Sequence, residues 1–425
     1  MRGPRSRPSG RRSKAGRVRG LVTLLTLLMT VDYADRGVLG AMAPTLKQVF
    51  SMSNTRYGLM SALFGVIGGV ATLPAGWLVD RVRRTVLLGR SVAIWSVALL
   101  ATGAASSYAW LLVSRMFLAV VAATVGPAFP SLAGDAVNPQ KRGRFLGHVE
   151  SGQLIGGAVG VAVGALAVST VGWRWGFWVL VAPGVFLSFR LVREPEPARS
   201  STHGQAAGWS LLTVFSYLLG RRTPLLVLLA VTAANAFLAG ASSFAVIFAV
   251  GQYQISNAAA DLALLALGLG ALLGVVIGGR VSDTLVRSRH PATRLKLAGT
   301  AAALAAVLWL PALLLRSLPE ALPFLIVGAF FLASILPTLD AVRVEVVPAS
   351  IRGRAEAART LLRTLAEGGV PLLIGFAADH LAGGGSAGLQ VAFLATLPAL
   401  LVAAALTAAA ALSYRTDEAA ARQAE

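Results

Sequence analysis

Long apolar stretches alternate with short polar breaks along the whole chain. An α-helix needs about 20 mostly apolar residues to cross the apolar core of a bilayer, and the apolar stretches have this length. We therefore expect an all-α membrane protein with twelve transmembrane helices. The predicted spans are 20–44, 56–79, 86–106, 108–134, 144–168, 172–192, 223–250, 259–285, 292–315, 319–342, 353–380 and 386–413.

The longest polar interruption lies at the middle of the chain and separates two sets of six predicted spans. Related halves are common in transporters, and a weak repeat supports them here: Gly76 and Asp80 follow the second span with the spacing at which Gly279 and Asp283 follow the eighth. The sequence thus predicts two pseudo-symmetric six-helix bundles. The predicted parts are a basic tail (1–19), a first bundle (20–192), a linker (193–222), a second bundle (223–413) and a short tail (414–425).

Lys and Arg residues gather in every second connection between the predicted spans. Because cytoplasmic loops carry this excess, the pattern predicts that the even-numbered connections and both termini are cytoplasmic, in a plasma membrane of the bacterial inner-membrane type. The basic N-terminal tail resembles the start of a signal peptide. However, Asp32, Asp35 and Arg36 follow the apolar stretch without a small-residue cleavage site, so we expect the segment to be retained.

Composition excludes several classes of function. Hydrophobic residues make up 56% of the chain and charged residues 13%, which is too apolar for a soluble domain of this length. The net charge of +20 lies in tails and loops, without the basic helix face of a nucleic-acid-binding protein. The chain has no cysteine, and its four histidines lack metal-ligand spacing. Without a nucleophile triad or a phosphate-binding loop, we expect no enzyme, no cofactor and no ATP-driven pump.

The loop after the second span carries a recognisable motif. The residues Gly76-Trp-Leu-Val-Asp80-Arg81-Val-Arg83-Arg84 resemble the signature loop of the major facilitator superfamily, which implies the twelve-helix fold of that superfamily. Asp80 is placed to meet the positive end of a helix from the other half, and the arginines add charge-assisted hydrogen bonds. The alternative is a set of positive-inside arginines beside a chance Asp. The expected cytoplasmic gate is Gly76, Asp80, Arg81, Arg84, Asp283 and Arg354.

Several islands resemble a narrower group, the spinster family of lysolipid and sphingolipid transporters. The matching residues are Asp32-Tyr33-Ala34-Asp35-Arg36, Arg115 with Pro130 and Asp135, Asp340, Val347-Pro348, Arg354-Ala355-Glu356-Ala357, Pro371-Leu-Leu-Ile-Gly375 and Asp379. Two positions depart from the family pattern: Asp32 replaces the usual Asn, and Ala122 stands where a Glu is common. The segment between Ala357 and Pro371 also lacks the family's His and Gly-Asp. The chain thus looks like a diverged relative.

Charged residues inside the predicted spans indicate a transport pathway. An ionised side chain at mid-bilayer costs at least about 2.5 to 3.5 kcal/mol, so such residues normally face the bundle interior. We expect proton coupling at Asp35, Glu150 or Asp340, and substrate anchoring by Arg36 and Arg115, with Arg115 pairing with Asp35 or Glu150. The alternative for each is a structural ion pair or a side chain that reaches the membrane surface.

Two aromatic residues of the seventh span, Phe237 and Phe244, could line an apolar cavity for an acyl chain, with simple packing as the alternative. The leading hypothesis is a proton-coupled transporter of an anionic lysophospholipid or sphingolipid. The alternatives are a multidrug or small organic-anion transporter and, from another class, a membrane-bound lipid-modifying enzyme or sensor. The expected partners are the lipid or amphipathic substrate, protons and membrane lipids, without nucleic acid, and the chain is expected to act as a monomer.

Overall fold

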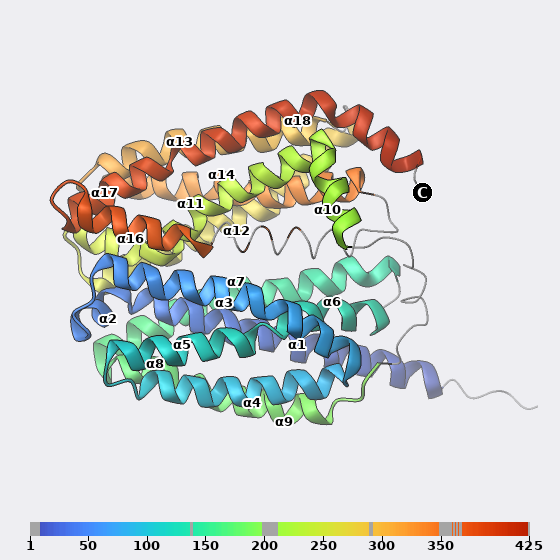
Figure 1. The fold of residues 1–425 in the computed structure, drawn as a ribbon, viewed down its shortest axis with the longest axis horizontal. Helices are drawn as coiled ribbons and strands as arrows, with labels where there is room; N and C mark the ends of the chain where they lie inside the picture. Colours follow the sequence, from blue (N-terminus) through green and yellow to red (C-terminus); the bar gives the residue numbers. More distant parts are fainter. Residues whose placement is uncertain are drawn as a thin grey trace, which may run out of the picture. The chain divides into compact units, whose positions relative to one another are not determined.

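The computed structural model describes residues 9–136, 139–197, 211–288, 292–347, 359, 362, 364 and 368–423. Within these residues all regular elements are α-helices (Figure 1). They are α1 (Ser9–Ala41), α2 (Ala43–Val49), α3 (Asn54–Arg81), α4 (Arg84–Gly103), α5 (Tyr108–Ala122), α6 (Val125–Ala136), α7 (Pro139–Thr170), α8 (Trp173–Trp178), α9 (Val181–Arg193), α10 (Leu211–Gly220), α11 (Arg222–Tyr253), α12 (Asn257–Ser288), α13 (Thr293–Leu314), α14 (Leu318–Val346), α16 (Val370–His380), α17 (Gly385–Thr396) and α18 (Pro398–Gln423).

Ten helical segments of the described part are long and apolar enough to cross a membrane. The first predicted span lies in α1, where Asp32, Asp35 and Arg36 interrupt the apolar stretch. The end of the eleventh lies in α16, a shorter apolar helix. The all-helical architecture predicted from hydropathy is therefore confirmed.

Three predicted spans consist of two helices each instead of one. The span 108–134 divides into α5 and α6, 172–192 into α8 and α9, and 386–413 into α17 and α18. In each case a proline stands in the first turn of the second helix, namely Pro127, Pro183 and Pro398. Proline lacks a backbone N–H and its ring crowds the preceding turn, so the helix is interrupted just before it.

The chain forms two compact units. Unit 1 comprises residues 1–39 and 70–201, and unit 2 comprises 40–69 and 202–425. In unit 1, α4 lies beside α5, α8 and α9, whereas in unit 2 α14 lies beside α12 and α13, and α11 beside α18 (Figure 1). Helix α2 and the first part of α3 thus pack with helices from the second half of the sequence. The predicted linker contains helix α10, and α18 continues beyond residue 413 to Gln423.

Glycine contacts hold α1 and α7 together in unit 1. A Cβ atom added at Gly156 would overlap the backbone carbonyl of Thr30, and one added at Gly160 would overlap that of Ala34. The backbones can approach this closely because glycine has no side chain, which is the usual packing device of membrane helices. The glycines of α7 thus allow close packing of its backbone on α1.

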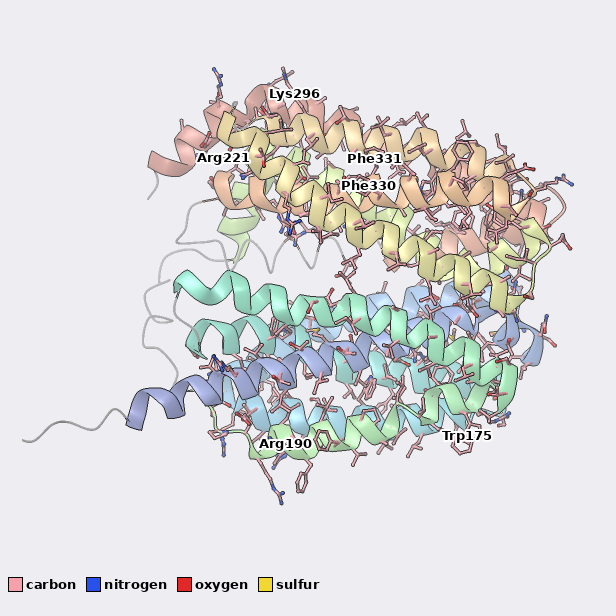
Figure 2. All side chains as sticks on the ribbon, turned by 180° about the vertical axis from the view of Figure 1, so that it is seen from behind. Trp175, Arg190, Arg221, Lys296, Phe330 and Phe331 are labelled. Atoms are coloured by element: carbon pink, nitrogen blue, oxygen red, sulfur yellow. The ribbon has the colours of Figure 1, made fainter. Side chains whose placement is uncertain are left out.

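The same device joins α12 and α14 in unit 2. Gly274 faces the backbone of Phe330, and Gly278 faces Ser334. Figure 2 shows Phe330 and Phe331 near the middle of unit 2, with Arg221 and Lys296 toward one end of it. The cations thus lie apart from the apolar middle of the helices, as expected for a bundle in lipid.

Candidate functional site

A buried ion pair joins α1 and α5 in unit 1. The Arg115 guanidinium donates hydrogen bonds of 2.7 and 2.9 Å to the two carboxylate oxygens of Asp35. Both side chains are only 1% exposed. The structure thus gives Arg115 one of the two partners expected from the sequence. Removing either partner would leave an uncompensated buried charge, which typically costs about 3 to 5 kcal/mol.

Arg36 lies one residue beyond this pair and is far more accessible. Its guanidinium is 3.1 Å from Asp32, one helical turn earlier, and lies over the Tyr33 ring at 4.6 Å. The Arg36 side chain is 48% exposed, and that of Asp32 is 12% exposed. Because Arg36 and Asp35 are adjacent on a helix, their side chains point about 100° apart. Asp35 therefore pairs with α5, whereas Arg36 pairs with Asp32 on its own helix.

A cavity in unit 1 extends to Asp32. It is a small cavity of about 20 Å³ between α1, α4, α5, α6 and α9. Its lining is apolar apart from Asp32, the Ser91 hydroxyl and the indole of Trp95, and it includes Ala122. The cavity residues are Leu28, Val31, Asp32, Ser91, Val92, Trp95, Val121, Ala122, Val125 and Leu187.

The other two candidate coupling carboxylates have different settings. Asp340 pairs with Arg343 one turn later, at 2.8 Å, and its side chain is 52% exposed. This is a local pair at the end of an apolar helix, which weakens the case for a buried coupling role. Glu150 belongs to α7, and its side chain lies outside the described residues.

The two predicted substrate-binding aromatics are fully buried in ring contacts within unit 2. The Phe237 ring packs edge-on against Trp309, with 5.0 Å between the ring centroids. The Phe244 ring packs in the same way against Tyr57, with 5.4 Å between the centroids. A third ring of the same helix, Phe248, lines a cavity. These contacts favour packing as the role of Phe237 and Phe244.

That cavity lies in unit 2 and has a volume of about 50 Å³. Its walls come from α11, α12, α13, α14 and α17 and are almost wholly apolar, with Phe248, Trp309, Leu313, Leu325 and Phe393 among them. Leu264 and Leu267 add aliphatic surface from α12. An alkyl chain is the chemistry that such a lining accommodates.

Arg84, a predicted gate residue, forms the centre of a charge cluster within unit 1. It donates to Asp135 at 2.6 Å and to Glu196 at 2.7 Å, and also to the Ser131 hydroxyl at 2.8 Å. Arg84 and Asp135 side chains are 2% exposed and Glu196 is 17% exposed. Glu196 in turn accepts from the backbone N–H of Thr85 at 3.0 Å.

These hydrogen bonds fix the charge of Glu196, which lies outside the predicted spans. Burial by itself would raise the pKa of its carboxyl. The hydrogen bonds from the Thr85 N–H and from Arg84 outweigh burial, and the pKa of Glu196 lies below its usual value. The start of the predicted linker is thus held to the start of α4 by a carboxylate that stays ionised.

The remaining gate residues are only partly described. Gly76 lies in α3, and the Arg81 guanidinium stacks over the Trp77 ring at 4.0 Å. The side chains of Asp80 and Asp283 and all of Arg354 lie outside the described residues. The predicted contact between Asp80 and the positive end of a helix from the other half therefore stays a prediction.

Sequence reasoning missed three features of the described residues. It did not join Arg84, Asp135 and Glu196, which lie far apart in the sequence. It overlooked Asp261, a buried carboxylate near the start of α12 whose Oδ1 accepts no hydrogen bond from any described group. The rule that charges inside spans are functional candidates would have found Asp261.

The third missed feature is a helix cap in unit 2. Asp379 of α16 accepts hydrogen bonds from the backbone N–H groups of Asn54 and Thr55, at 3.0 and 2.7 Å, and from the Thr55 hydroxyl at 2.6 Å. A carboxylate satisfies the free N–H groups at a helix start and complements its positive end. Asp379 thereby fixes the start of α3 against α16.

Comparisons with known proteins agree with this architecture. The Major Facilitator Superfamily is matched over residues 25–371. The probable L-galactonate transporter of Escherichia coli (strain K12) is 26% identical over 185 residues, which is 43% of this chain and 41% of that protein. Protein spinster homolog 1 of Homo sapiens is 27% identical over 194 residues, 44% of this chain and 37% of that protein. The match thus spans about two fifths of the length of these curated relatives.

A solved structure extends the likeness over the whole fold. The crystal structure of a bacterial homologue of the human lysosomal transporter Spinster, in an inward-facing and unoccupied conformation, has a TM-score of 0.80 and 22% sequence identity. The likeness covers 97% of this chain and 99% of that one. At this identity it shows the fold, which is the predicted twelve-helix architecture.

Proposed function

Because the chain belongs to the Major Facilitator Superfamily, whose members are transporters, we propose that it moves an amphipathic anionic lipid across the membrane by alternating access. The lipid is of the lysophospholipid or sphingolipid type. This substrate class rests on the resemblance of the sequence islands to the spinster family. It also rests on the chemistry of the two units, each considered by itself.

The observation that carries the proposal is the half-exposed guanidinium of Arg36 inside a membrane-spanning helix. A charge in this position is costly to place in the membrane, so such a residue is a candidate for function. A planar guanidinium suits a phosphate headgroup because it donates two parallel, charge-assisted hydrogen bonds. Arg36 is therefore the first anchor for the headgroup, and Arg115 is the second once Asp35 releases it.

The apolar cavity of unit 2 supplies the complementary chemistry for a lipid tail. Its walls are aliphatic and aromatic. Each methylene group moved from water into such surroundings contributes about 0.8 kcal/mol, so an acyl chain gains affinity without any polar contact. A lipid with one charged head and one tail matches both kinds of chemistry.

Proton coupling is the proposed energy source, with Asp35 as its carboxylate. Protonation of Asp35 removes its charge and so weakens its hold on Arg115, which becomes available to an anion. Glu150 and Asp340 are the other candidates from the sequence, and Asp340 is the weaker because it pairs locally with Arg343.

Flux of oleoyl-lysophosphatidylglycerol in proteoliposomes, with and without a pH gradient, tests the proposal. The wild-type protein should transport this anionic lysolipid faster with the gradient. Asp35→Asn should lose the gradient dependence while keeping lipid binding, and Arg115→Ala should weaken binding itself. Equal gradient dependence in Asp35→Asn and wild type excludes Asp35 as the coupling site, and the absence of lysolipid flux rejects the substrate class.

A small organic anion is the second candidate substrate. The likeness to a probable L-galactonate transporter favours it, because a sugar acid also presents a carboxylate to an arginine. A multidrug substrate is the other transport alternative, and a membrane enzyme or sensor is the alternative from another class. Competition of galactonate and of a lipophilic cation against bound lysolipid separates the transport candidates: displacement by galactonate alone favours the organic anion.

The proposed location is a plasma membrane of the bacterial inner-membrane type, with both termini in the cytoplasm. The excess of Lys and Arg in alternate connections supports this orientation. Reporter fusions after Gly204 and after Glu425 should both report the cytoplasm, and either one outside rejects the topology. The chain is proposed to act as a monomer surrounded by membrane lipids, which mass measurement in detergent checks.

A further inference from the structure

Asp261 is a buried carboxylate that the proposed transport mechanism does not use. It lies in the second turn of α12, inside a segment that is long and apolar enough to cross a membrane. The residue is 2% exposed. Its Oδ1 atom accepts no hydrogen bond from a described group, and within the described part of the chain no cation pairs with the carboxylate. Asp261 therefore lacks the arginine partner that Asp35 and Asp135 each have.

The start of α12 does not need this carboxylate as a cap. Ser256 precedes the helix, and its hydroxyl accepts a hydrogen bond from the Ala259 N–H at 3.2 Å. The carbonyl oxygen of Ser256 accepts another from the Ala260 N–H at 3.0 Å. A serine in this position is an ordinary helix cap. Asp261 thus has no capping role at α12, in contrast to Asp379, which caps α3.

The titratable groups nearest to Asp261 along the fold belong to the outer end of unit 2, which we define as the end of α11 with the starts of α12 and α14. Lys296 lies toward the other end (Figure 2). In α11, the Tyr253 hydroxyl donates to a backbone carbonyl of α13 at 2.8 Å. Arg316 and Glu320 lie at the start of α14 and are exposed, and neither forms an ion pair with Asp261. The last turns of α13 and all of α17 contain no titratable residue.

An ionised carboxylate without a partner is unfavourable in such surroundings. Leu264 and Leu265, one turn after Asp261 on α12, add only apolar surface. A carboxyl group that is removed from water without a cation or hydrogen-bond donors becomes neutral instead of keeping its charge. The buried Asp261 therefore holds a proton as long as the outer end of unit 2 stays closed to water.

We propose that Asp261 is a proton-binding site and that release of its proton opens the outer end of unit 2 to water. With this end closed, Asp261 is the neutral acid. On deprotonation the proton passes to water, and the carboxylate keeps a negative charge that is stable only where water reaches it. High pH thus favours the open form. Under the proposed orientation this end faces away from the cytoplasm, so the site responds to the external pH.

Infrared spectroscopy of the purified protein tests the bound proton directly. At neutral pH the wild-type spectrum should contain a carboxylic-acid C=O band that is reduced in Asp261→Asn. Asp261→Glu should retain the band at a shifted frequency, and it serves as the test if the Asn variant does not fold. The control Glu320→Gln removes an exposed carboxylate, which is ionised at neutral pH, and should leave the band unchanged. An unchanged band in Asp261→Asn, or an unshifted one in Asp261→Glu, overturns the assignment.

Thiol labelling tests whether this proton controls the access of water to the outer end of unit 2. The chain contains no cysteine, so an introduced cysteine is the sole thiol. Ala260→Cys places it beside Asp261, at a position that is 2% exposed. Ala258→Cys places it on the same turn at an exposed position, and corrects for the ionisation of the thiol itself. The measured quantity is the ratio of the two labelling rates with a methanethiosulfonate reagent.

This ratio, Ala260→Cys over Ala258→Cys, should rise between about pH 6 and about pH 9, by up to about tenfold per pH unit, because release of one proton changes the opening equilibrium by at most that factor. With Asp261→Asn added to both variants, the ratio should stay low and constant. A constant ratio in the presence of Asp261, or the same rise after Asp261→Asn, overturns the control of opening by this proton.

These tests are independent of the proposed substrate. Neither experiment uses a lipid, so the absence of lysolipid flux would reject the proposed function and leave Asp261 as a proton-binding site. Conversely, failure of both tests at Asp261 would leave the proposed coupling at Asp35 unaffected.

Discussion

Replacing Arg84 should destabilise unit 1 far more than replacing its neighbour Arg83. Arg84 neutralises two carboxylates at 2.6 and 2.7 Å, and its side chain and that of Asp135 are 2% exposed. Arg84→Leu would leave Asp135 as a buried charge without its cation, which costs about 3 to 5 kcal/mol. Glu196 adds little to this figure because it is more exposed and keeps its bond from the Thr85 N–H.

Even the lower estimate of about 3 kcal/mol corresponds to a measurable decrease in melting temperature. A compact unit of this size loses about 2 to 4 °C of melting temperature per kcal/mol, so Arg84→Leu should melt about 6 to 12 °C lower. Tryptophan fluorescence of the purified protein in detergent, scanned at one fixed heating rate, reports this apparent melting temperature. The rate is held constant because membrane proteins often unfold irreversibly.

Arg83→Leu is the matched control for this experiment. It removes the same positive charge from the same connection, yet Arg83 is exposed, so its melting temperature should stay within about 2 °C of wild type. The double variant Arg84→Leu with Asp135→Leu should recover much of the loss, because it removes the stranded carboxylate. Equal losses in the two single variants, or no recovery in the double variant, would refute the reasoning.

Three further predictions follow from described contacts. The stability difference between wild type and Glu196→Gln should be fully present above the ordinary pKa of a glutamate side chain, about 4.3. It should be lost as the pH falls further, through the lowered pKa of Glu196. Melting curves across pH check this, and a difference that persists in strong acid contradicts it. Gly156→Ala should lower the free energy of unfolding by about 1 to 3 kcal/mol, because the added methyl group collides with α1. Gly157→Ala is the control, because a Cβ atom there meets open space. Equal melting temperatures of the two variants would exclude the close approach of α1 and α7. The double variant Asp35→Leu with Arg115→Met should keep a melting temperature near that of wild type, because an apolar pair can replace a buried ion pair without loss of stability. The same variant should lose lysolipid flux in proteoliposomes. Retained flux would mean that the ion pair has no role in transport.

Hydropathy predicted the helical fold because the backbone N–H and C=O groups of a span must be hydrogen-bonded to one another in lipid. A helix meets this requirement within its own segment, so the signal is local in the sequence. Pairing between distant residues is not local. Asp35 and Arg115 were found because both interrupt apolar spans, which makes them conspicuous. Glu196 lies in a polar segment where a charge is ordinary, and only the fold brings it to Arg84.

The packing of α3 shows a second limit of sequence reasoning. Residues 40–69 belong to the same compact unit as helices from the second half of the sequence. Hydropathy does not predict these neighbours, because an apolar helix surface can pack against any other apolar helix. The contacts that fix it are specific ones, such as the bonds from Asn54 and Thr55 to Asp379.

The acid–arginine pairs on α1 fit the proposed function better than a purely stabilising role. A well-packed apolar pair is often as stable as a buried ion pair, and each charge also carries a cost of insertion into the membrane. Asp35 with Arg115 and Asp32 with Arg36 nevertheless place two acid–arginine pairs on one helix and its neighbour. What an ion pair can do, and an apolar pair cannot, is respond to a proton or exchange one anion for another. The two pairs on α1 are therefore consistent with the proposed function, in which these arginines hold carboxylates in one state and an anionic substrate in another.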